Sequence, residues 1–109
     1  MAAFTSHVAA NIGHIIFSKP PVNAFDSSEW AAIAAEICTL GLRGDVHVIV
    51  ISAEGRGFCA GVDIKELGSR PEMIVPVNKG NYDTFEAIHK NPKPVIVVLH
   101  GFVLGGGIG

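Results

Sequence analysis

The chain has 109 residues, of which 49% are hydrophobic and 17% charged, with a net charge of −2 and a mean hydropathy of +0.41. This length suits one small domain, and no basic cluster indicates a nucleic-acid-binding surface. No apolar run reaches the roughly 18 residues of a membrane helix and the N-terminus lacks a signal-peptide pattern, so we expect a cytoplasmic protein without membrane contact. Cys38 and Cys59 belong to no C-x-x-C motif or Cys/His cluster, so no metal site is predicted.

Two strands, a connector and a helix are predicted in the first 41 residues. Residues 4–10 and 14–18 flank Asn11-Ile12-Gly13, which predicts a β-hairpin with its turn at Asn/Gly. Residues 20–25 begin with two prolines and predict a rigid extended connector. Asp26 or Ser27 can cap the helix that follows, with Glu29 in its first turn. Its apolar residues recur at helical spacing: Trp30, Ile33, Ile37 and Leu40, ending before Gly41 and Gly44.

The second half of the chain alternates predicted strands and helices. Residues 46–52 lack polar alternation, which predicts a strand covered on both faces, and a short helix is predicted over residues 62–67. Pro76 and Gly80 argue against one continuous helix over residues 71–80. A helix is predicted over residues 81–89 and a second buried strand over residues 95–99. One face of that helix is expected to carry Tyr82, Phe85 and Ile88.

Two stretches 44 residues apart are near-copies of each other. Each is an apolar strand that leads into G-F-x-x-G, at residues 57–61 and 101–105, and then reaches a helix start. Such a repeat indicates a stacked architecture. The first N–H groups of a helix have no partner within it. Two such turns side by side can therefore present two donors to one oxygen atom, which is the geometry of an oxyanion hole.

Three segments carry a family resemblance: E-G-R-G-F-C-A-G-V-D-I-K-E at residues 54–66, H-G-F-V-L-G-G-G at residues 100–107 and P-V-N-A-F at residues 21–25. They closely resemble segments of the crotonase (enoyl-CoA hydratase/isomerase) superfamily. The resemblance implies an α/β fold of ββα turns in a superhelix, with residues 1–109 forming the N-terminal part of one truncated domain. The Gly-rich helical turn at the end of the chain is not stable alone. We therefore expect this chain to be inactive by itself. We also expect it to self-associate, because the strand at residues 95–99 and the Trp30 helix would be left with uncovered apolar surface.

The resemblance also implies a substrate and its binding residues. The substrate is an acyl-CoA thioester, with coenzyme A as part of the substrate and no permanently bound cofactor. The thioester oxygen would lie between the backbone N–H groups of Val62 and Gly106, the pair that the internal repeat also indicates. Family members imply a homo-oligomer, a trimer or hexamer. The residues expected along the acyl-CoA path are Val22, Ala60, Val62, Asp63, Ile64, Lys65 and Gly106.

The chain also departs from the family pattern. Classical hydratases carry a catalytic Glu after G-G-G-x, where this sequence has Gly109. The combination of G-G-G-I-G with G-V-D-I-K-E looks most like a branch that acts on CoA thioesters from steroid-ring breakdown and hydrolyses a C–C bond of a cyclic β-diketone-type substrate. Asp63 and Glu66 are the nearest carboxylates and the candidates for acid–base catalysis. A helix N-cap or a surface acid is the favoured alternative for both.

Several alternatives remain open from sequence. The reaction can be hydration, isomerisation or ring hydrolysis, and the chain can also be a truncated non-catalytic homologue that only binds CoA or partner subunits. The glycines at 105, 107 and 109 mimic the start of a dinucleotide fingerprint, and the paired turns can serve tight packing alone. Lys65 and Arg56 either steer CoA phosphates or lie on a solvated face. Cys59 is interpreted as a small buried filler and not as a nucleophile.

Overall fold

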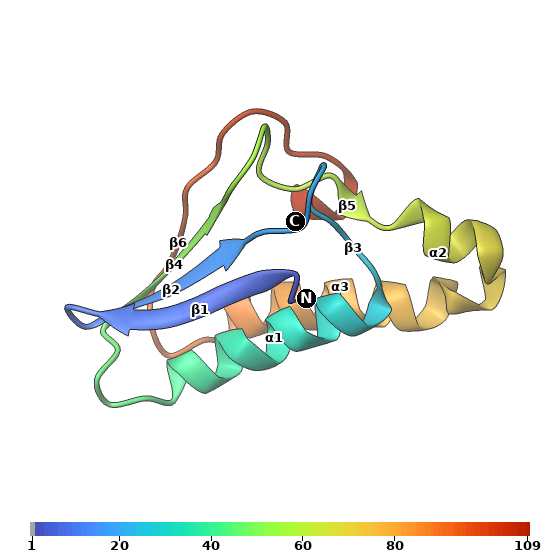
Figure 1. The fold of residues 1–109 in the computed structure, drawn as a ribbon. Coiled ribbons are helices and arrows are strands. Elements are labelled where there is room, and N and C mark those ends of the chain that lie inside the picture. Colours follow the sequence, from blue (N-terminus) through green and yellow to red (C-terminus); the bar gives the residue numbers. More distant parts are fainter. Residues whose placement is uncertain (1) are drawn as a thin grey trace.

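Residues 2–109 form a four-stranded sheet, a two-stranded sheet and two long packed helices in the computed structural model (Figure 1). The four-stranded sheet has the order β1-β2-β4-β6, and β3 pairs with β5. No helix in this described range is long and apolar enough to cross a membrane. In chain order the elements are β1 (Phe4–Ala9), β2 (Ile12–Phe17), β3 (Ala24–Phe25), α1 (Ser27–Gly41), β4 (Val48–Ala53), β5 (Gly61–Val62), α2 (Ile64–Ser69), the 3₁₀ turn η1 (Pro71–Met73), α3 (Ile74–His89), β6 (Val95–Val97) and the 3₁₀ turn η2 (Gly105–Gly107).

The large sheet begins with the predicted hairpin and continues with parallel strands. β1 is antiparallel to β2, whereas β2, β4 and β6 are parallel. The hairpin turn consists of Ala10 and Asn11, whose φ angles are 51° and 64°. A two-residue turn of this kind needs positive φ at both positions. The predicted hairpin is confirmed, but its turn lies at residues 10–11 and not at residues 11–13, because Ile12 and Gly13 already belong to β2.

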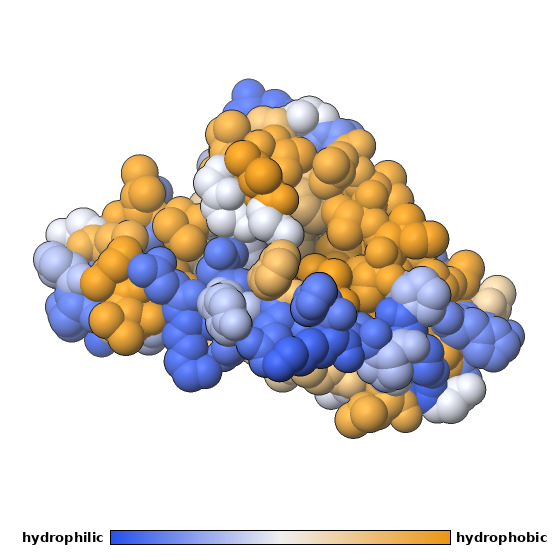
Figure 2. Space-filling model, turned by 180° about the vertical axis from the view of Figure 1, so that it is seen from behind, coloured by the Kyte–Doolittle hydropathy of each residue, from blue (hydrophilic) through white to orange (hydrophobic). Residues whose placement is uncertain are grey.

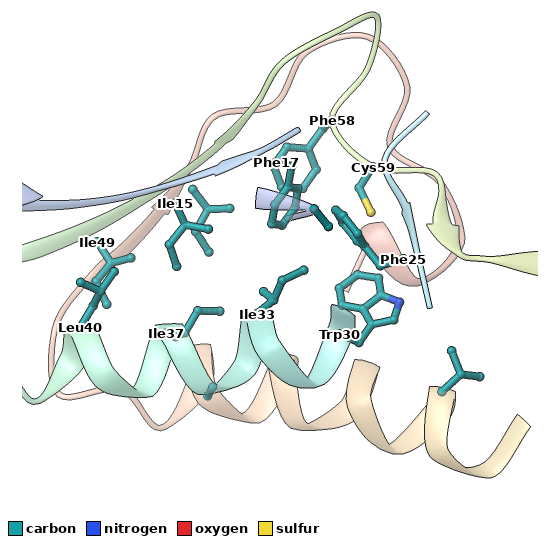
Figure 3. Close-up of a cluster of buried hydrophobic side chains, with 14 of the residues drawn as sticks. Ile15, Phe17, Phe25, Trp30, Ile33, Ile37, Leu40, Ile49, Phe58 and Cys59 are labelled. Carbon is teal, nitrogen blue, oxygen red and sulfur yellow. The ribbon is translucent and has the colours of Figure 1, made fainter. Parts of the chain in front are cut away.

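Helix α1 supplies one side of the hydrophobic core, as predicted. Asp26 is its N-cap: the Asp26 carboxylate accepts from Glu29 N, and the Glu29 carboxylate accepts from Asp26 N, which is a capping box. The apolar stripe of α1 packs toward Ile15 and Ile49 of the sheet, with Phe17, Phe25 and Phe58 at its N-terminal end (Figure 3). The predicted stripe is confirmed, since Trp30, Ile33, Ile37 and Leu40 are all buried.

Helix α3 differs from the sequence-based prediction. It begins at Ile74, so one helix runs through Pro76 and Gly80. Pro76 is tolerated because it is the third residue of the helix, where the backbone N–H has no partner within the helix. Gly80 packs against Trp30, and a methyl group on Gly80 would lie 2.9 Å from Trp30 Cβ. Thr84 also reaches α1, because its hydroxyl donates to the Trp30 carbonyl (3.0 Å).

The buried face of α3 is consequently a small-residue face. Its buried residues are Val77, Gly80, Thr84 and Ala87. The face predicted to carry Tyr82, Phe85 and Ile88 is a different one, on which Tyr82 and Phe85 are 60% and 48% exposed. Close approach of α1 selects the small side chains for this contact and leaves the aromatic ones outside. Helix α2 begins two residues later than predicted, because Asp63 is its N-cap.

The two strands predicted to be buried on both faces, β4 and β6, are buried on one face or less. In β4, Ile49 and Ile51 are buried, whereas Val48 and Val50 are only half-buried. β6 is an edge strand, and Ile96 is 53% exposed. Figure 2 shows a broad apolar surface on this side of the molecule. The exposed large apolar residues of this region include Ile96, Val97, Val98, Leu99 and Leu104.

The contact between α1 and α3 predicts opposite effects for two glycine substitutions. Gly80→Ala should lower the free energy of unfolding by about 1–3 kcal/mol, because the new methyl group overpacks against Trp30. Gly68→Ala in α2 is the matched control, because a methyl group there meets nothing within 4 Å. It should leave stability unchanged or raise it by up to about 1 kcal/mol. Urea unfolding measures the free energy of unfolding of both variants. A Gly80→Ala protein as stable as the control would contradict this packing.

Candidate functional site

The two G-F-x-x-G turns lie side by side. Cys59 and Val103, which occupy the same position in the two copies, form an isolated parallel bridge. The N–H of Leu104 donates to the Cys59 carbonyl (2.9 Å), and the N–H of Phe58 donates to the Phe102 carbonyl (2.9 Å). The internal repeat thus becomes a structural repeat in which equivalent backbone segments pair.

This pairing brings Gly61 of β5 against the turn η2. Gly61 has a φ of +102°, and a methyl group on it would lie 2.9 Å from Gly106 N and 3.1 Å from the Leu104 carbonyl oxygen. Glycine is required at this position by both the conformation and the close approach. No backbone carbonyl of residues 2–109 accepts from the Gly106 N–H.

The N–H of Val62 has a direction that follows from its neighbour. The N–H of Asp63 donates to the Phe25 carbonyl (2.8 Å), so it points toward β3. Successive N–H groups along an extended strand point to opposite edges. The Val62 N–H therefore faces the edge of β5 away from β3, and η2 contacts β5. The structure thus brings the Val62 and Gly106 segments together.

A buried asparagine ties the segments of this site to each other. Asn23 is 3% exposed and has a φ of 55°. Its amide nitrogen Nδ2 lies 3.1–3.2 Å from the carbonyl oxygens of Glu54, Gly57 and Phe58. Its Oδ1 accepts from the backbone N–H of Lys19 (2.8 Å). Sequence reasoning missed this role, although an Asn that follows a Pro-rich stretch and tolerates positive φ was an available signal.

The connector before β3 is less extended than predicted. Residues 20–22 form a turn, which the N–H of Asn23 closes by donating to the Lys19 carbonyl (2.8 Å), and only the last two residues form β3. The Pro20–Pro21 peptide bond is cis. This turn forms one wall of a cavity beside β5.

That cavity contains six of the seven residues predicted to line the acyl-CoA path. Its volume is about 350 Å³. Gly106 lies elsewhere, in a second cavity of about 180 Å³ that Trp30, Phe58 and Phe85 also line. Trp30 Nε1 is buried and has no hydrogen-bond partner within the described residues. The lining of the larger cavity is Lys19, Pro20, Pro21, Val22, Ala24, Ala60, Val62, Asp63, Ile64 and Lys65.

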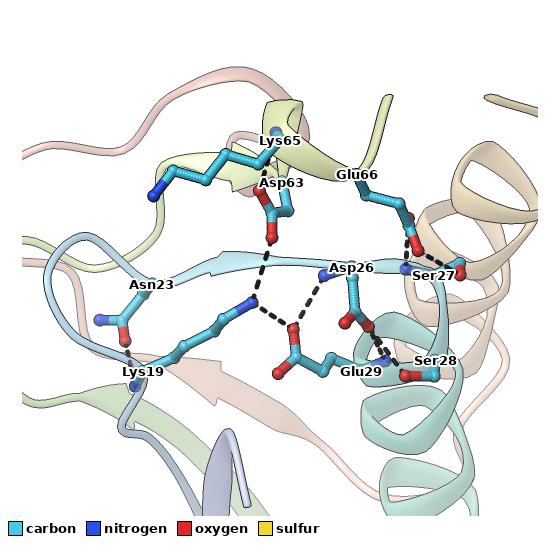
Figure 4. A network of polar contacts seen from close by, with 9 residues as sticks. All are labelled: Lys19, Asn23, Asp26, Ser27, Ser28, Glu29, Asp63, Lys65 and Glu66. Carbon is cyan, nitrogen blue, oxygen red and sulfur yellow. Dashed lines mark hydrogen bonds and ion pairs between the residues drawn. The ribbon is translucent and has the colours of Figure 1, made fainter. Parts of the chain in front are cut away.

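A polar network lies at the edge of the larger cavity (Figure 4). The Lys19 ammonium contacts the carboxylates of Glu29 (2.5 Å) and Asp63 (3.6 Å). Burial disfavours the charge of Lys19, but the hydrogen bond and charge of Glu29, with Asp63 and Asp26, outweigh it and raise the Lys19 pKa. Lys65 is exposed, and its side chain extends away from these carboxylates. Lys19 is therefore neutralised within the fold, whereas Lys65 is available to an anion.

The two candidate acid–base residues both have structural partners. The Asp63 carboxylate accepts from Lys65 N (2.9 Å) as the N-cap of α2. The two carboxylate oxygens of Glu66 accept from the N–H and from the hydroxyl of Ser27, each at 3.0 Å. Glu66 thus holds the first residue of α1 across 39 residues of sequence. No group of three or more His, Cys, Asp or Glu in residues 2–109 can hold a metal ion.

The cysteines have different environments. Cys59 is buried, and this burial raises its thiol pKa to about 11, although the N–H of Gly61 donates to Sγ and opposes the shift. Cys38 is an exposed free thiol on α1. Cys59 therefore carries very little thiolate at neutral pH, which disfavours a nucleophilic role.

Comparison with known proteins identifies one family and several similar relatives. The pattern of the enoyl-CoA hydratase/isomerase family matches residues 12–109. The chain is 44% identical over 92 residues to the (7aS)-7a-methyl-1,5-dioxo-2,3,5,6,7,7a-hexahydro-1H-indene-carboxyl-CoA hydrolase of Rhodococcus jostii (strain RHA1), which covers 83% of this chain and 36% of that protein. It is 42% identical over 93 residues to the protein of the same name from Mycobacterium tuberculosis (strain ATCC 25618 / H37Rv), with coverage of 83% and 37%.

A solved structure of similar fold is that of human enoyl Coenzyme A hydratase domain-containing protein 3. It superposes with a TM-score of 0.88 at 26% sequence identity, and the match covers 96% of this chain and 43% of the human chain. The chain thus spans little more than a third of the length of the two curated relatives above.

The Asn23 contacts predict a large effect for a nearly isosteric change. Asn23→Asp keeps the shape and the tolerance of positive φ, but it removes the donor that faces three carbonyl groups, of which those of Gly57 and Phe58 are buried. We expect the free energy of unfolding to fall by about 3 kcal/mol or more. Asn78→Asp, at an exposed position of α3, is the control and should change it by less than about 0.5 kcal/mol. Equal unfolding midpoints for the two variants would refute the role of Asn23.

The thiol environments predict selective alkylation. At pH 8 the native chain should react with iodoacetamide at Cys38 and resist it at Cys59, because a pKa raised from 9.0 to about 11 lowers the thiolate fraction about 100-fold and burial blocks access. Peptide mass spectrometry locates the label, and reaction in 6 M guanidinium is the control in which both thiols react. Comparable labelling of both cysteines in the native protein would show that Cys59 is not buried as described.

Proposed function

Because this chain belongs to the enoyl-CoA hydratase/isomerase family, we propose that it provides the thioester-binding part of an acyl-CoA enzyme. The thioester carbonyl oxygen accepts hydrogen bonds from the backbone N–H groups of Val62 and Gly106. The observation that carries this proposal is the close approach of β5 and η2, with a methyl position on Gly61 only 2.9 Å from Gly106 N.

The chemistry explains why main-chain donors suit this position. Formation of an enolate, or attack on the thioester, places negative charge on one oxygen atom. A preorganised N–H donor directed at that atom contributes about 3–4 kcal/mol to the transition state. The absence of Cβ atoms on Gly61 and Gly106 allows a thioester to approach the backbone closely.

The coenzyme A moiety occupies the cavity of about 350 Å³ beside β5. This cavity is bordered by the apolar Val22, Ala60 and Ile64 and by two cationic side chains. Lys19 is neutralised by Glu29 and Asp63, so Lys65 is the cation that meets the CoA phosphates. The acyl group extends from the thioester into the cavity of about 180 Å³, whose wall includes Gly106, Phe85 and Leu99.

The reaction class that we favour is hydrolysis of a ring C–C bond next to the thioester. Water adds to the ring ketone and the bond to the thioester α-carbon breaks. The ketone carbon becomes a carboxylate, and the bonding electrons pass to the thioester oxygen as an enolate, which a proton then quenches at carbon. The support is the identity of 44% to a relative named as a hydrolase of a dioxo-indene carboxyl-CoA, together with Gly109 in place of a hydratase Glu.

Proton transfer is not assigned to Asp63 or Glu66 in this proposal. Asp63 caps α2 and contacts Lys19, and both Glu66 oxygens accept from Ser27. A general acid or base must release these partners in order to act, so their loss would disturb the fold as well as the chemistry. The contribution of residues 2–109 to catalysis is the stabilised enolate. The whole protein is proposed to act as a homo-oligomer, as family resemblance implies, and its proposed location is the cytoplasm.

Two substitutions at Val62 separate the loss of the backbone N–H from the loss of the side chain. The chain should bind acetoacetyl-CoA, an enolisable thioester, at least about tenfold more tightly than coenzyme A. Val62→Pro removes the N–H and should abolish this preference, since a lost donor to a charged oxygen costs about 1.5–3 kcal/mol. Val62→Ala keeps the N–H and should retain the preference within about twofold. Isothermal titration calorimetry measures the affinities of the three proteins for both ligands.

Two results would count against the enzymatic proposal. If wild type binds the thioester and coenzyme A equally, the alternative of a non-catalytic CoA-binding homologue is favoured. If Val62→Pro keeps the thioester preference of Val62→Ala, the oxygen does not lie at the Val62 N–H.

A further inference from the structure

The turn η2 is contacted by a polar side chain of α3. Asn81 Nδ2 donates to the carbonyl of Gly106 (3.3 Å), and a methyl group on Gly106 would lie 2.8 Å from that nitrogen. Asn81 is half-buried. Within the described residues, this is the one side chain that hydrogen-bonds to the backbone of residues 105–107. The contact joins two segments that are 25 residues apart.

Three consecutive glycines need such support because they have no side chains to pack. Glycine also loses more conformational freedom than any other residue when it is ordered. The peptide group between Gly105 and Gly106 is held by the N–H of Ile108, which donates to the Gly105 carbonyl (3.1 Å). The next peptide group, between Gly106 and Gly107, has its carbonyl held by Asn81. The two contacts together fix the peptide groups on both sides of Gly106.

Asn81 is itself placed by a rigid contact. One turn beyond Gly80, the hydroxyl of Thr84 donates to the Trp30 carbonyl, and Gly80 packs against Trp30. These contacts therefore fix the position of α3 along α1 at the point from which the Asn81 side chain projects. A path of direct contacts runs from the core of α1 through α3 to the Gly106 peptide.

We infer that Asn81 is a positioning residue for the Gly106 N–H. It holds the η2 turn in the orientation in which this N–H meets the thioester oxygen, through its hydrogen bond to the Gly106 carbonyl. This inference rests on the proposed function, because it assigns the contact a role in thioester binding beyond holding the turn. Asparagine suits the task because its amide donates to a carbonyl, whereas an aspartate of the same shape would repel it.

The first measurement concerns the turn and needs no ligand. In the ¹⁵N-labelled chain, Asn81→Ala and Asn81→Asp should speed hydrogen exchange at the Gly107 and Ile108 amides at least about tenfold, with Asn81→Asp the faster. Exchange at Ile49, whose N–H donates to the Pro94 carbonyl in the sheet, should not change. Asn78→Ala and Asn78→Asp are the matched controls, because Asn78 lies on the same helix at an exposed position.

The second measurement distinguishes positioning from a purely structural role. In both Asn81 variants, the preference for acetoacetyl-CoA over coenzyme A should fall at least about fivefold, while the affinity for coenzyme A itself stays within about twofold of wild type. The Asn78 variants should keep both values. This split is expected because coenzyme A alone occupies the cavity beside β5, away from Gly106.

The outcomes separate the inference from the proposed function. Unchanged exchange at Gly107 and Ile108 in both Asn81 variants overturns the inference whatever the ligand does. Faster exchange with an unchanged thioester preference overturns it too, because Asn81 then holds the turn without serving the oxygen. If the wild-type chain shows no thioester preference, the proposed function is wrong and the inference fails with it. Faster exchange in the Asn81 variants would then show that the Asn81 contact exists and that the failure lies in the proposed function.

Discussion

The hydrogen bonds of the buried Asn23 amide are the constraint on which the site depends. Its nitrogen faces the carbonyl groups of residues 54, 57 and 58, and its oxygen accepts from the N–H of Lys19. The same two segments are joined by a second hydrogen bond, in which the Ala60 N–H donates to the Val22 carbonyl (3.1 Å). These bonds fix the distance between the turn at residues 20–22 and the first G-F-x-x-G turn, which are the two walls of the larger cavity. Strand pairing adds only the short β3–β5 ladder, in which Ala24 pairs with Gly61 and Phe25 with Val62.

The remainder of the site is made of main chain, and this explains the internal repeat. Pairing of equivalent positions, as between Cys59 and Val103, requires two backbones to approach without side chains between them. Gly61 meets this requirement directly, since any Cβ there would collide with Gly106 N. A site of backbone donors leaves the side chain of Val62 free to vary, whereas its glycine neighbours are fixed by geometry. The function is therefore more visible in the spacing of glycines than in any catalytic side chain.

Sequence reasoning predicted the local features of the fold and missed those that depend on distant partners. The α1 stripe and an N-cap at Asp26 or Ser27 follow from periodicity and residue type, and the structure confirms the stripe and places the cap at Asp26. The sequence-based prediction interrupted helix α3 at Pro76, because the sequence alone does not show that this proline lies in the first turn of the helix. The sequence does not show which face of α3 is buried, because contact with Trp30 selects Gly80 and Thr84, and that contact spans about fifty residues. The repeat placed Val62 and Gly106 in one region, but the partners of Asn23 and Glu66 carry no local signal.

The arrangement of charges decides how this site can act. Lys19 lies between Glu29 and Asp63, and Glu66 is occupied by Ser27, so four ionisable groups near β5 serve to hold the loops and helix starts together. Lys65 extends away from them, toward solvent. Carboxylates that hold the structure together are poor proton-transfer groups, because each proton transfer would break a cap or an ion pair and cost folding free energy. Stabilisation of an oxyanion by fixed N–H groups avoids this conflict, since a backbone N–H remains a hydrogen-bond donor in the same position throughout the reaction.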